Sequence, residues 1–276
     1  MGVSIYNPVW GLHDIASKTV LLKKIFFIVV IFSSFEFNTS CQEKAYKSVE
    51  YPNDYTAQID VVYTRINDWE GRMDLYTNPN SELPTPIVIN IHGRGWNHGM
   101  KESQTGFGSF FTNGYAVANV EYRLADVAPA PAAIEDVRCA LIYLYKHAEE
   151  LNIDTNKIIV MGASAGGHLA LMAGLLASDN RFDSNCEFDG EIEVVAIIDK
   201  YGVSDLFPLT FNNSVTKWLG DGYENRKFVE SVSPFYYVSK NSPPILIVHG
   251  SEDPLVPYEQ SVLLYEKLKA NNIKQN

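Results

Sequence analysis

Short apolar runs alternate with longer amphipathic segments along most of this 276-residue chain. Apolar runs of the kind that forms buried strands occupy residues 86–91, 116–121, 157–161, 193–199 and 244–249. Helical patterns occupy residues 101–113, 131–150, 165–178 and 258–271. An antiparallel hairpin is predicted to open the fold, at 58–65 and 72–76. The order of these segments predicts an α/β fold, in which helices cover both faces of a mostly parallel sheet.

The sequence GASAG at 162–166 joins the strand predicted at 157–161 to the helix predicted at 165–178. A Gly-x-Ser-x-Gly motif between a strand and a helix is typical of a nucleophile elbow, a cramped turn that exposes the serine hydroxyl. The N-terminus of the following helix favours developing negative charge. Ser164 is therefore the candidate nucleophile, and the alternative is a glycine-rich turn without a chemical role.

A loop earlier in the chain carries a candidate oxyanion hole. The sequence HGRGW at 92–96 follows the strand predicted at 86–91, where backbone N–H groups can help to bind a tetrahedral oxyanion. We predict as donors the N–H groups of Arg94, Gly95 and Ala165. Arg94 stands where glycine is usual in such loops, and its side chain adds a cation beside the pocket.

Asp253 follows the strand predicted at 244–249 and is the candidate acid of a Ser-Asp-His triad, because the acid comes after the serine in the chain order of such folds. The serine also needs a base, which is usually a histidine oriented by the acid. No histidine lies between Asp253 and Asn276. We therefore expect the base to lie beyond Asn276, with a last strand and helix, and the chain without it to be nearly inactive. Structural roles are expected for three other histidines: His92, His168 and His249.

Residues 58–276 resemble the α/β-hydrolase superfamily of serine esterases, and within it the bifunctional feruloyl and acetylxylan carbohydrate esterases of the hormone-sensitive-lipase-like His-Gly-Gly-Gly group. The resemblance rests on five segments in the family's order and spacing: HGRGW at 92–96, EYRL at 121–124, EDVR at 135–138, GASAGGH at 162–168 and HGSED at 249–253. It implies an α/β-hydrolase fold and hydrolysis of acetyl, feruloyl or other short acyl esters. Serine chemistry needs no metal, and no Cys/His cluster has zinc-ligand spacing, so we expect no cofactor.

Residues 201–237 show little periodicity and predict a cap-like excursion over the site. Two aromatic side chains in this segment, Trp218 and Tyr223, are candidate substrate-binding groups, together with Trp96 of the oxyanion loop. The alternative for these aromatics is local packing.

Composition fits one large domain with a well-buried core, since 46% of the residues are hydrophobic and 20% are charged. The formal net charge of −11 argues against a nucleic-acid partner, because such binding depends on Lys and Arg neutralising phosphates. The expected partner is a small-molecule or polysaccharide ester.

The N-terminal 40 residues contain a predicted signal peptide. Lys23 and Lys24 precede the apolar run at 25–32, and small or polar residues lead from there to Cys41. The run is shorter than the roughly 20 residues that a membrane-spanning helix needs. Residues 1–19 form an extension upstream of this signal.

The sequence NTSC at 38–41 resembles a bacterial lipoprotein cleavage box, which makes Cys41 the candidate lipidated residue. A polar tether at 41–57 would then precede the hydrolase domain at 58–276. We expect an exported protein, either a bacterial membrane-anchored lipoprotein or a periplasmic or extracellular one, with membrane contact only through the anchor. Plain secretion and an uncleaved anchor are the alternatives.

Two further cysteines lie in the hydrolase domain. Cys139 falls in the helix predicted at 131–150, and Cys186 lies in a polar segment that predicts a surface loop. An exported protein permits a disulfide, but the spacing leaves open whether these two residues pair.

The resulting hypothesis is an exported serine esterase that removes acetyl or feruloyl groups from plant cell-wall carbohydrate. Two alternatives stay open. One is a non-catalytic hydrolase-fold protein that binds a carbohydrate or a partner, and the other is a general carboxylesterase or amidase.

Overall fold

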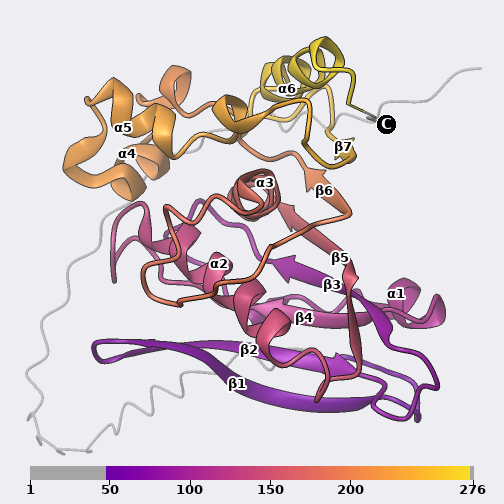
Figure 1. Cartoon of the computed structure of the whole chain (residues 1–276). Coiled ribbons are helices and arrows are strands. Elements are labelled where there is room, and N and C mark those ends of the chain that lie inside the picture. The colour runs from indigo at the N-terminus through magenta and orange to yellow at the C-terminus, as the bar shows by residue number, and fades with distance from the viewer. Residues whose placement is uncertain (1–47, 274–276) are drawn as a thin grey trace, which may run out of the picture. The chain divides into compact units, whose positions relative to one another are not determined.

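The protein, seen in a computed structural model that describes residues 48–273, is built on a seven-stranded sheet (Figure 1). Its strands lie in the order β1-β2-β4-β3-β5-β6-β7. Their bounds are Thr56–Ile66 (β1), Trp69–Thr77 (β2), Thr85–Ile91 (β3), Ala116–Val120 (β4), Ile153–Ala163 (β5), Ala196–Lys200 (β6) and Ile245–Val248 (β7). β2 pairs antiparallel with β1 and with β4, and every other pair is parallel. The predicted hairpin and mostly parallel sheet are confirmed.

Helices cover both faces of this sheet, as predicted. They are α1 (Gly108–Thr112), α2 (Ala132–Lys146), α3 (Ala165–Leu176), α4 (Asn213–Leu219), α5 (Arg226–Ser231) and α6 (Glu259–Ala270). Side chains alternate along β4, so Ala116, Ala118 and Val120 join the core that α2 and α3 cover. Val117 points to the other face and packs with Phe111 of α1.

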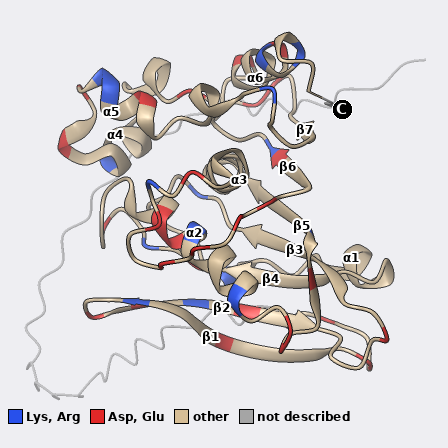
Figure 2. Ribbon diagram, viewed as in Figure 1, with Lys and Arg blue, Asp and Glu red and all other residues tan. Residues whose placement is uncertain are grey.

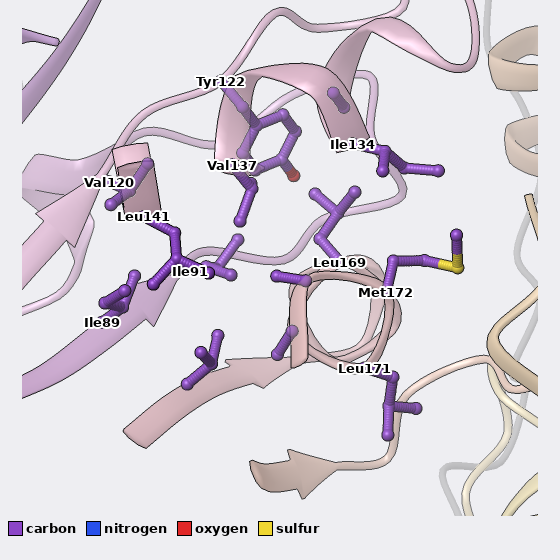
Figure 3. Close-up of a cluster of buried hydrophobic side chains, with 14 of the residues drawn as sticks. Ile89, Ile91, Val120, Tyr122, Ile134, Val137, Leu141, Leu169, Leu171 and Met172 are labelled. Atoms are coloured by element: carbon purple, nitrogen blue, oxygen red, sulfur yellow. The ribbon is translucent and has the colours of Figure 1, made fainter. Parts of the chain in front are cut away.

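The main core lies between β3, β4, α2 and α3 (Figure 3). Ile89 and Ile91 of β3 contribute to it from the sheet, and Leu141 of α2 and Leu169 of α3 contribute from the helices. All residues of α3 are buried, and none is charged (Figure 2). The apolar side chains around α3 hold this helix in place. They thereby also fix the GASAG motif, which runs from the end of β5 into the first turn of α3.

Several predicted boundaries differ from the observed ones, most of all those of the first predicted helix. The helix predicted at 101–113 is a single 3-10 turn, Lys101–Ser103, followed by the five-residue α1. Gly106 and Gly108 disfavour a continuous helix there. β5 is also longer than its apolar run at 157–161, because Thr85 of β3 already pairs with Ile153.

The segment that follows β6 contains α4, α5 and three 3-10 turns, although its sequence shows little periodicity. Side-chain caps begin both short helices: Asn212 accepts the N–H groups of Ser214 and Val215, and Asn225 accepts the N–H of Phe228. In Figure 1 the orange α4 and α5 lie on the side toward which the arrows of β3 and β5 point. Ligands usually bind at this carboxyl edge in α/β folds.

Cys139 of α2 and Cys186 form a disulfide with 5.5 Å between their Cα atoms. A buried ion pair lies on the same two segments, since Arg138 Nη2 is 2.6 Å from Asp183 Oδ2 and Arg138 Nε donates to Asp183 Oδ1 at 2.8 Å. Together they fasten the loop after α3 to α2.

The predicted signal peptide and residues 41–47 of the tether, Cys41 among them, lie outside the described residues. Within residues 48–273, none of the helices has the length and apolar character needed to cross a bilayer.

Candidate active site

Ser164 occupies the turn between β5 and α3, with φ of 55° and ψ of −121°. Glycine is required two residues before and two residues after it. A Cβ on Gly162 would lie 2.1 Å from the carbonyl oxygen of Gly166, and a Cβ on Gly166 would lie 2.2 Å from the carbonyl oxygen of Ile91. The motif therefore folds as the strained strand-to-helix turn that the sequence predicts.

The turn leaves the Ser164 hydroxyl available for chemistry. Ser164 is half-buried, and its N–H donates to the carbonyl of Lys200 at 2.9 Å. The Oγ atom makes no hydrogen bond within residues 48–273 and lies at the N-terminus of α3. A hydroxyl at a helix N-terminus that is not engaged in a hydrogen bond suits a nucleophile whose attack creates negative charge.

The oxyanion loop has three successive residues in the left-handed region, with φ of 76° at Arg94, 63° at Gly95 and 57° at Trp96. A bifurcated hydrogen bond braces its start, because the Tyr122 hydroxyl is shared between the carbonyl of His92 at 3.1 Å and that of Gly93 at 3.3 Å. The loop is thus held in a conformation that non-glycine residues rarely adopt.

One pocket of about 350 Å³ brings these elements together. Ser164, Arg94 and Gly95 line it, while Ala165 lies buried directly after the serine. The other lining residues are Trp96, His98, Val203, Leu209, Asn212, Ser214, Val215, Leu255 and Val256. The residues that the 201–237 segment contributes to the pocket lining belong to no recognisable motif. Asn212 and Ser214 were therefore not predicted from the sequence.

Asp253 lies beside this pocket rather than in its lining. Its Oδ1 atom accepts the N–H of Leu255 at 2.8 Å and that of Val256 at 3.0 Å, and both residues line the pocket. These N–H groups of Val256 and Leu255 hold the pKa of the Asp253 carboxyl below its ordinary value, and the nearby His249 acts in the same direction. An ionised carboxylate therefore stands at the pocket at neutral pH.

Three buried histidines have structural partners. His249 bonds through Nδ1 to Ser261 Oγ at 2.7 Å and through Nε2 to the Val256 carbonyl at 3.1 Å, and its Nε2 is 3.7 Å from Asp253 Oδ2. His92 stacks on Tyr122 with 4.3 Å between the ring centroids. Burial lowers its pKa to about 4, so the ring is neutral.

His168 links two candidate aromatics. It accepts a hydrogen bond from Trp96 Nε1 at 3.3 Å and bonds through Nε2 to the Val232 carbonyl at 2.7 Å. Burial lowers its pKa to about 4, which makes the ring neutral, with Nε2 as its donor. Trp218 is fully buried and stacks on Trp96 with 4.8 Å between ring centroids. Tyr223 is exposed and its hydroxyl donates to Glu224, and neither Trp218 nor Tyr223 is among the pocket-lining residues.

Metal binding has no candidate among the described residues, where no group of three or more His, Cys, Asp or Glu side chains could hold an ion.

The sheet order and the serine turn define an α/β-hydrolase. The sequence profile of the BD-FAE family matches residues 73–268, more than half of the chain, and the chain belongs to this family. This finding confirms the resemblance inferred from the motifs.

Several proteins to which the chain is similar are esterases. Esterase LipC of Mycobacterium tuberculosis is 29% identical over 199 residues, covering 68% of this chain and 49% of that protein. A truncated form of a carbohydrate esterase from gut microbiota is similar with a TM-score of 0.70 and 26% identity, over 82% of this chain and 88% of that one. An acetyl ester-xyloside bifunctional hydrolase from Caldicellulosiruptor lactoaceticus is similar with a TM-score of 0.67 and 28% identity, over 76% of this chain and 77% of that one. The chain spans about half the length of the curated relatives it matches.

Proposed function

We propose that this protein is a serine carboxylic-ester hydrolase that deacylates carbohydrate. The observation that carries the proposal is the Ser164 hydroxyl, which is held without a hydrogen-bond partner in the described chain, at a strained turn and in one pocket with the oxyanion loop. A protein that only binds carbohydrate needs no such arrangement.

The reaction follows from these positions. Ser164 Oγ attacks the ester carbonyl carbon, and a base takes the hydroxyl proton. The N–H groups of Arg94, Gly95 and Ala165 stabilise the resulting oxyanion, a contribution worth about a hundred- to a thousand-fold in rate for each donor. The intermediate then expels the alcohol, which receives the proton from the base. Water attacks the acyl-serine in the same way and releases the acid.

The base is proposed to be a histidine outside residues 48–273. His168 and His249 already bond indole, hydroxyl or backbone groups through both ring nitrogens, and His92 is buried with its Nδ1 on the Gly93 carbonyl, so we assign the base to none of these three. Asp253 uses Oδ1 to accept two backbone N–H groups, which leaves Oδ2 to orient such a histidine. In this arrangement the carboxylate fixes the tautomer and does not itself take the proton.

Acetyl groups on plant cell-wall xylan are the preferred substrate of the proposal, with feruloyl groups second. The sugar would occupy part of the pocket of about 350 Å³. The space that remains fits a small acetyl group better than a larger aromatic acyl group. The similarity to carbohydrate esterases supports this choice. A general carboxylesterase would act on small esters alone.

The experiment compares full-length wild-type protein with Ser164→Ala on acetylated xylan, a feruloylated oligosaccharide and a simple aryl acetate. Ser109→Ala, an exposed serine of α1, is the matched control. We expect Ser164→Ala to lose turnover by a factor on the order of a million, and Ser109→Ala to keep it. Full activity of Ser164→Ala would refute the mechanism, and activity confined to the aryl acetate would refute the carbohydrate substrate.

Export to the outside of a bacterial membrane, through lipid on Cys41 and the tether at 41–57, completes the proposal. The Cys139–Cys186 disulfide supports it, because disulfides persist mainly in oxidising compartments. A Cys41→Ser variant should leave the membrane fraction, and one that stays there would contradict the anchor.

A further inference from the structure

The pocket at Ser164 is lined by a guanidinium and by no carboxylate, in a chain whose formal net charge is −11. Arg94 supplies this cation, and it makes no hydrogen bond or ion pair within residues 48–273. Every other arginine of the described chain lies within 4.0 Å of a carboxylate oxygen: Arg65, Arg72, Arg123, Arg138, Arg181 and Arg226. The unpaired guanidinium thus lies at the pocket.

The backbone fixes where this side chain begins. Arg94 has φ of 76°, a conformation in which glycine would be unstrained. Its neighbour Gly93 is wedged so closely that an added Cβ would lie 2.4 Å from the carbonyl oxygen of Ala163. The Cα of Arg94 is therefore anchored beside the serine turn. An arginine occupies a position where the backbone favours glycine, so the side chain itself is the feature to explain.

Asp253 accepts the N–H groups of two pocket-lining residues and forms no ion pair with Arg94. Its Oδ1 atom is bonded by two backbone N–H groups, and its Oδ2 atom faces His249. No side chain described in the structure neutralises the Arg94 charge, which leaves it available to a bound substrate.

We propose that Arg94 makes the pocket selective for esters that carry a carboxylate, either on the alcohol, as in a uronic-acid sugar, or on the acyl group, as in a dicarboxylic half-ester. This selectivity rests on the proposed ester-hydrolase function. A planar guanidinium can bind a carboxylate through two parallel hydrogen bonds. Because the Arg94 side chain is exposed, water weakens the attraction, and we expect a preference of about twofold to fivefold.

The test measures kcat/KM of the full-length protein on two ester pairs matched in size. For the alcohol side, 4-acetoxybenzoate is compared with its neutral methyl ester. For the acyl side, monophenyl glutarate is compared with phenyl pentanoate. The readout is the ratio of the charged to the neutral ester within each pair, so a change in general activity cancels. The pair that responds identifies which side of the ester carries the recognised carboxylate.

Wild type is compared with Arg94→Met and Arg94→Lys. In at least one pair the ratio should fall by about twofold to fivefold in Arg94→Met, and Arg94→Lys should keep part of the preference for the charged ester. Two matched controls should keep the wild-type ratio. Arg65→Met removes the same charge from an exposed position on β1, and His98→Gln changes another side chain of the pocket lining.

Any of the following outcomes would refute the proposed selectivity. Unchanged ratios in Arg94→Met would show that its charge is not used, and an equal fall in Arg65→Met would show an effect of net charge alone. A fall confined to His98→Gln would assign the preference to the imidazole. If wild type hydrolyses acetylated xylan but none of the four esters, the selectivity fails, and if it hydrolyses none of these substrates, the proposed function itself fails. Hydrolysis of the four esters without an Arg94-dependent ratio refutes only the selectivity.

Discussion

A buried carboxylate beneath the serine turn should make the stability of the protein depend on pH. Asp199 near the end of β6 has no exposed surface. Its Oδ1 atom accepts the N–H of Gly202 at 2.9 Å, while its Oδ2 atom has no partner. The group packs against the first turn of α3, since a Cβ on Gly167 would lie 2.6 Å from Oδ1. Burial raises the pKa of Asp199 to about 7, against the smaller opposing effect of the Gly202 hydrogen bond.

The sign of the pH effect follows from the proton count. Between the ordinary carboxyl pKa of about 3.9 and the folded value, the folded protein holds a proton that the unfolded chain has released. The free energy of unfolding contributed by Asp199 is therefore fully present below about pH 4 and is lost as pH rises to about 7. At about 1.4 kcal/mol per pH unit, the full loss is about 4 kcal/mol, of which about 3 kcal/mol falls between pH 5 and pH 8.

Asp199→Asn tests this reasoning, because asparagine has the same shape and cannot ionise. Urea unfolding followed by tryptophan fluorescence gives the free energy of unfolding of both proteins at pH 5, 6, 7 and 8. The variant should gain about 3 kcal/mol relative to wild type across that range. Asp189→Asn makes the same change at an exposed side chain and supplies the reference. A difference between Asp199→Asn and wild type that stays constant from pH 5 to pH 8 would refute the buried titration.

Two further predictions concern covalent and steric constraints. Replacing Cys139 and Cys186 together with alanine should lower the free energy of unfolding by about 4 kcal/mol, the loop-closure value for a disulfide that spans 47 residues; denaturation with and without reductant checks this, and an unchanged midpoint in reductant would contradict it. Gly162→Ala should cost about 3 kcal/mol or more, because its Cβ would meet a backbone carbonyl. Gly108→Ala, with no atom within 4 Å of the added Cβ, should be neutral or slightly stabilising by thermal melting, and equal melting temperatures for the two glycine variants would contradict the steric argument.

The sequence predicted the strands well because each central strand is buried on both faces and is therefore a continuous apolar run. β3 and β4 show this most clearly, since nearly all their residues are buried. The sequence did not predict helices that are set by side-chain caps and not by a hydrophobic repeat. α4 and α5 are short helices set by the side-chain caps of Asn212 and Asn225, and no hydrophobic repeat marks them.

The same contrast applies to the candidate site, because one part of it could be predicted from the sequence and another could not. The serine turn could be placed from its glycines, because a Cβ at Gly162 or Gly166 would collide with backbone. The remaining walls of the pocket come from a segment without a motif, so Asn212 and Ser214 could not be anticipated. Two cysteines without characteristic spacing likewise carried no signal for the disulfide, which depends on where the loop after α3 returns to α2.

The backbone conformations around the pocket indicate why this part of the fold needs such extensive support. Asparagine and aspartate tolerate a positive φ, and four of them adopt one: Asp60, Asn67, Asn152 and Asn272. At the pocket the residues with positive φ are less tolerant, namely Arg94, Trp96 and Ser164. Such conformations persist only where neighbouring contacts enforce them. Trp96 is enforced by its stacking on Trp218 and its bond to His168, and Ser164 by the Lys200 carbonyl and the buried α3. The apolar core around α3 therefore does more than stabilise the domain, because it holds the serine and the oxyanion loop in the strained geometry that the proposed chemistry requires.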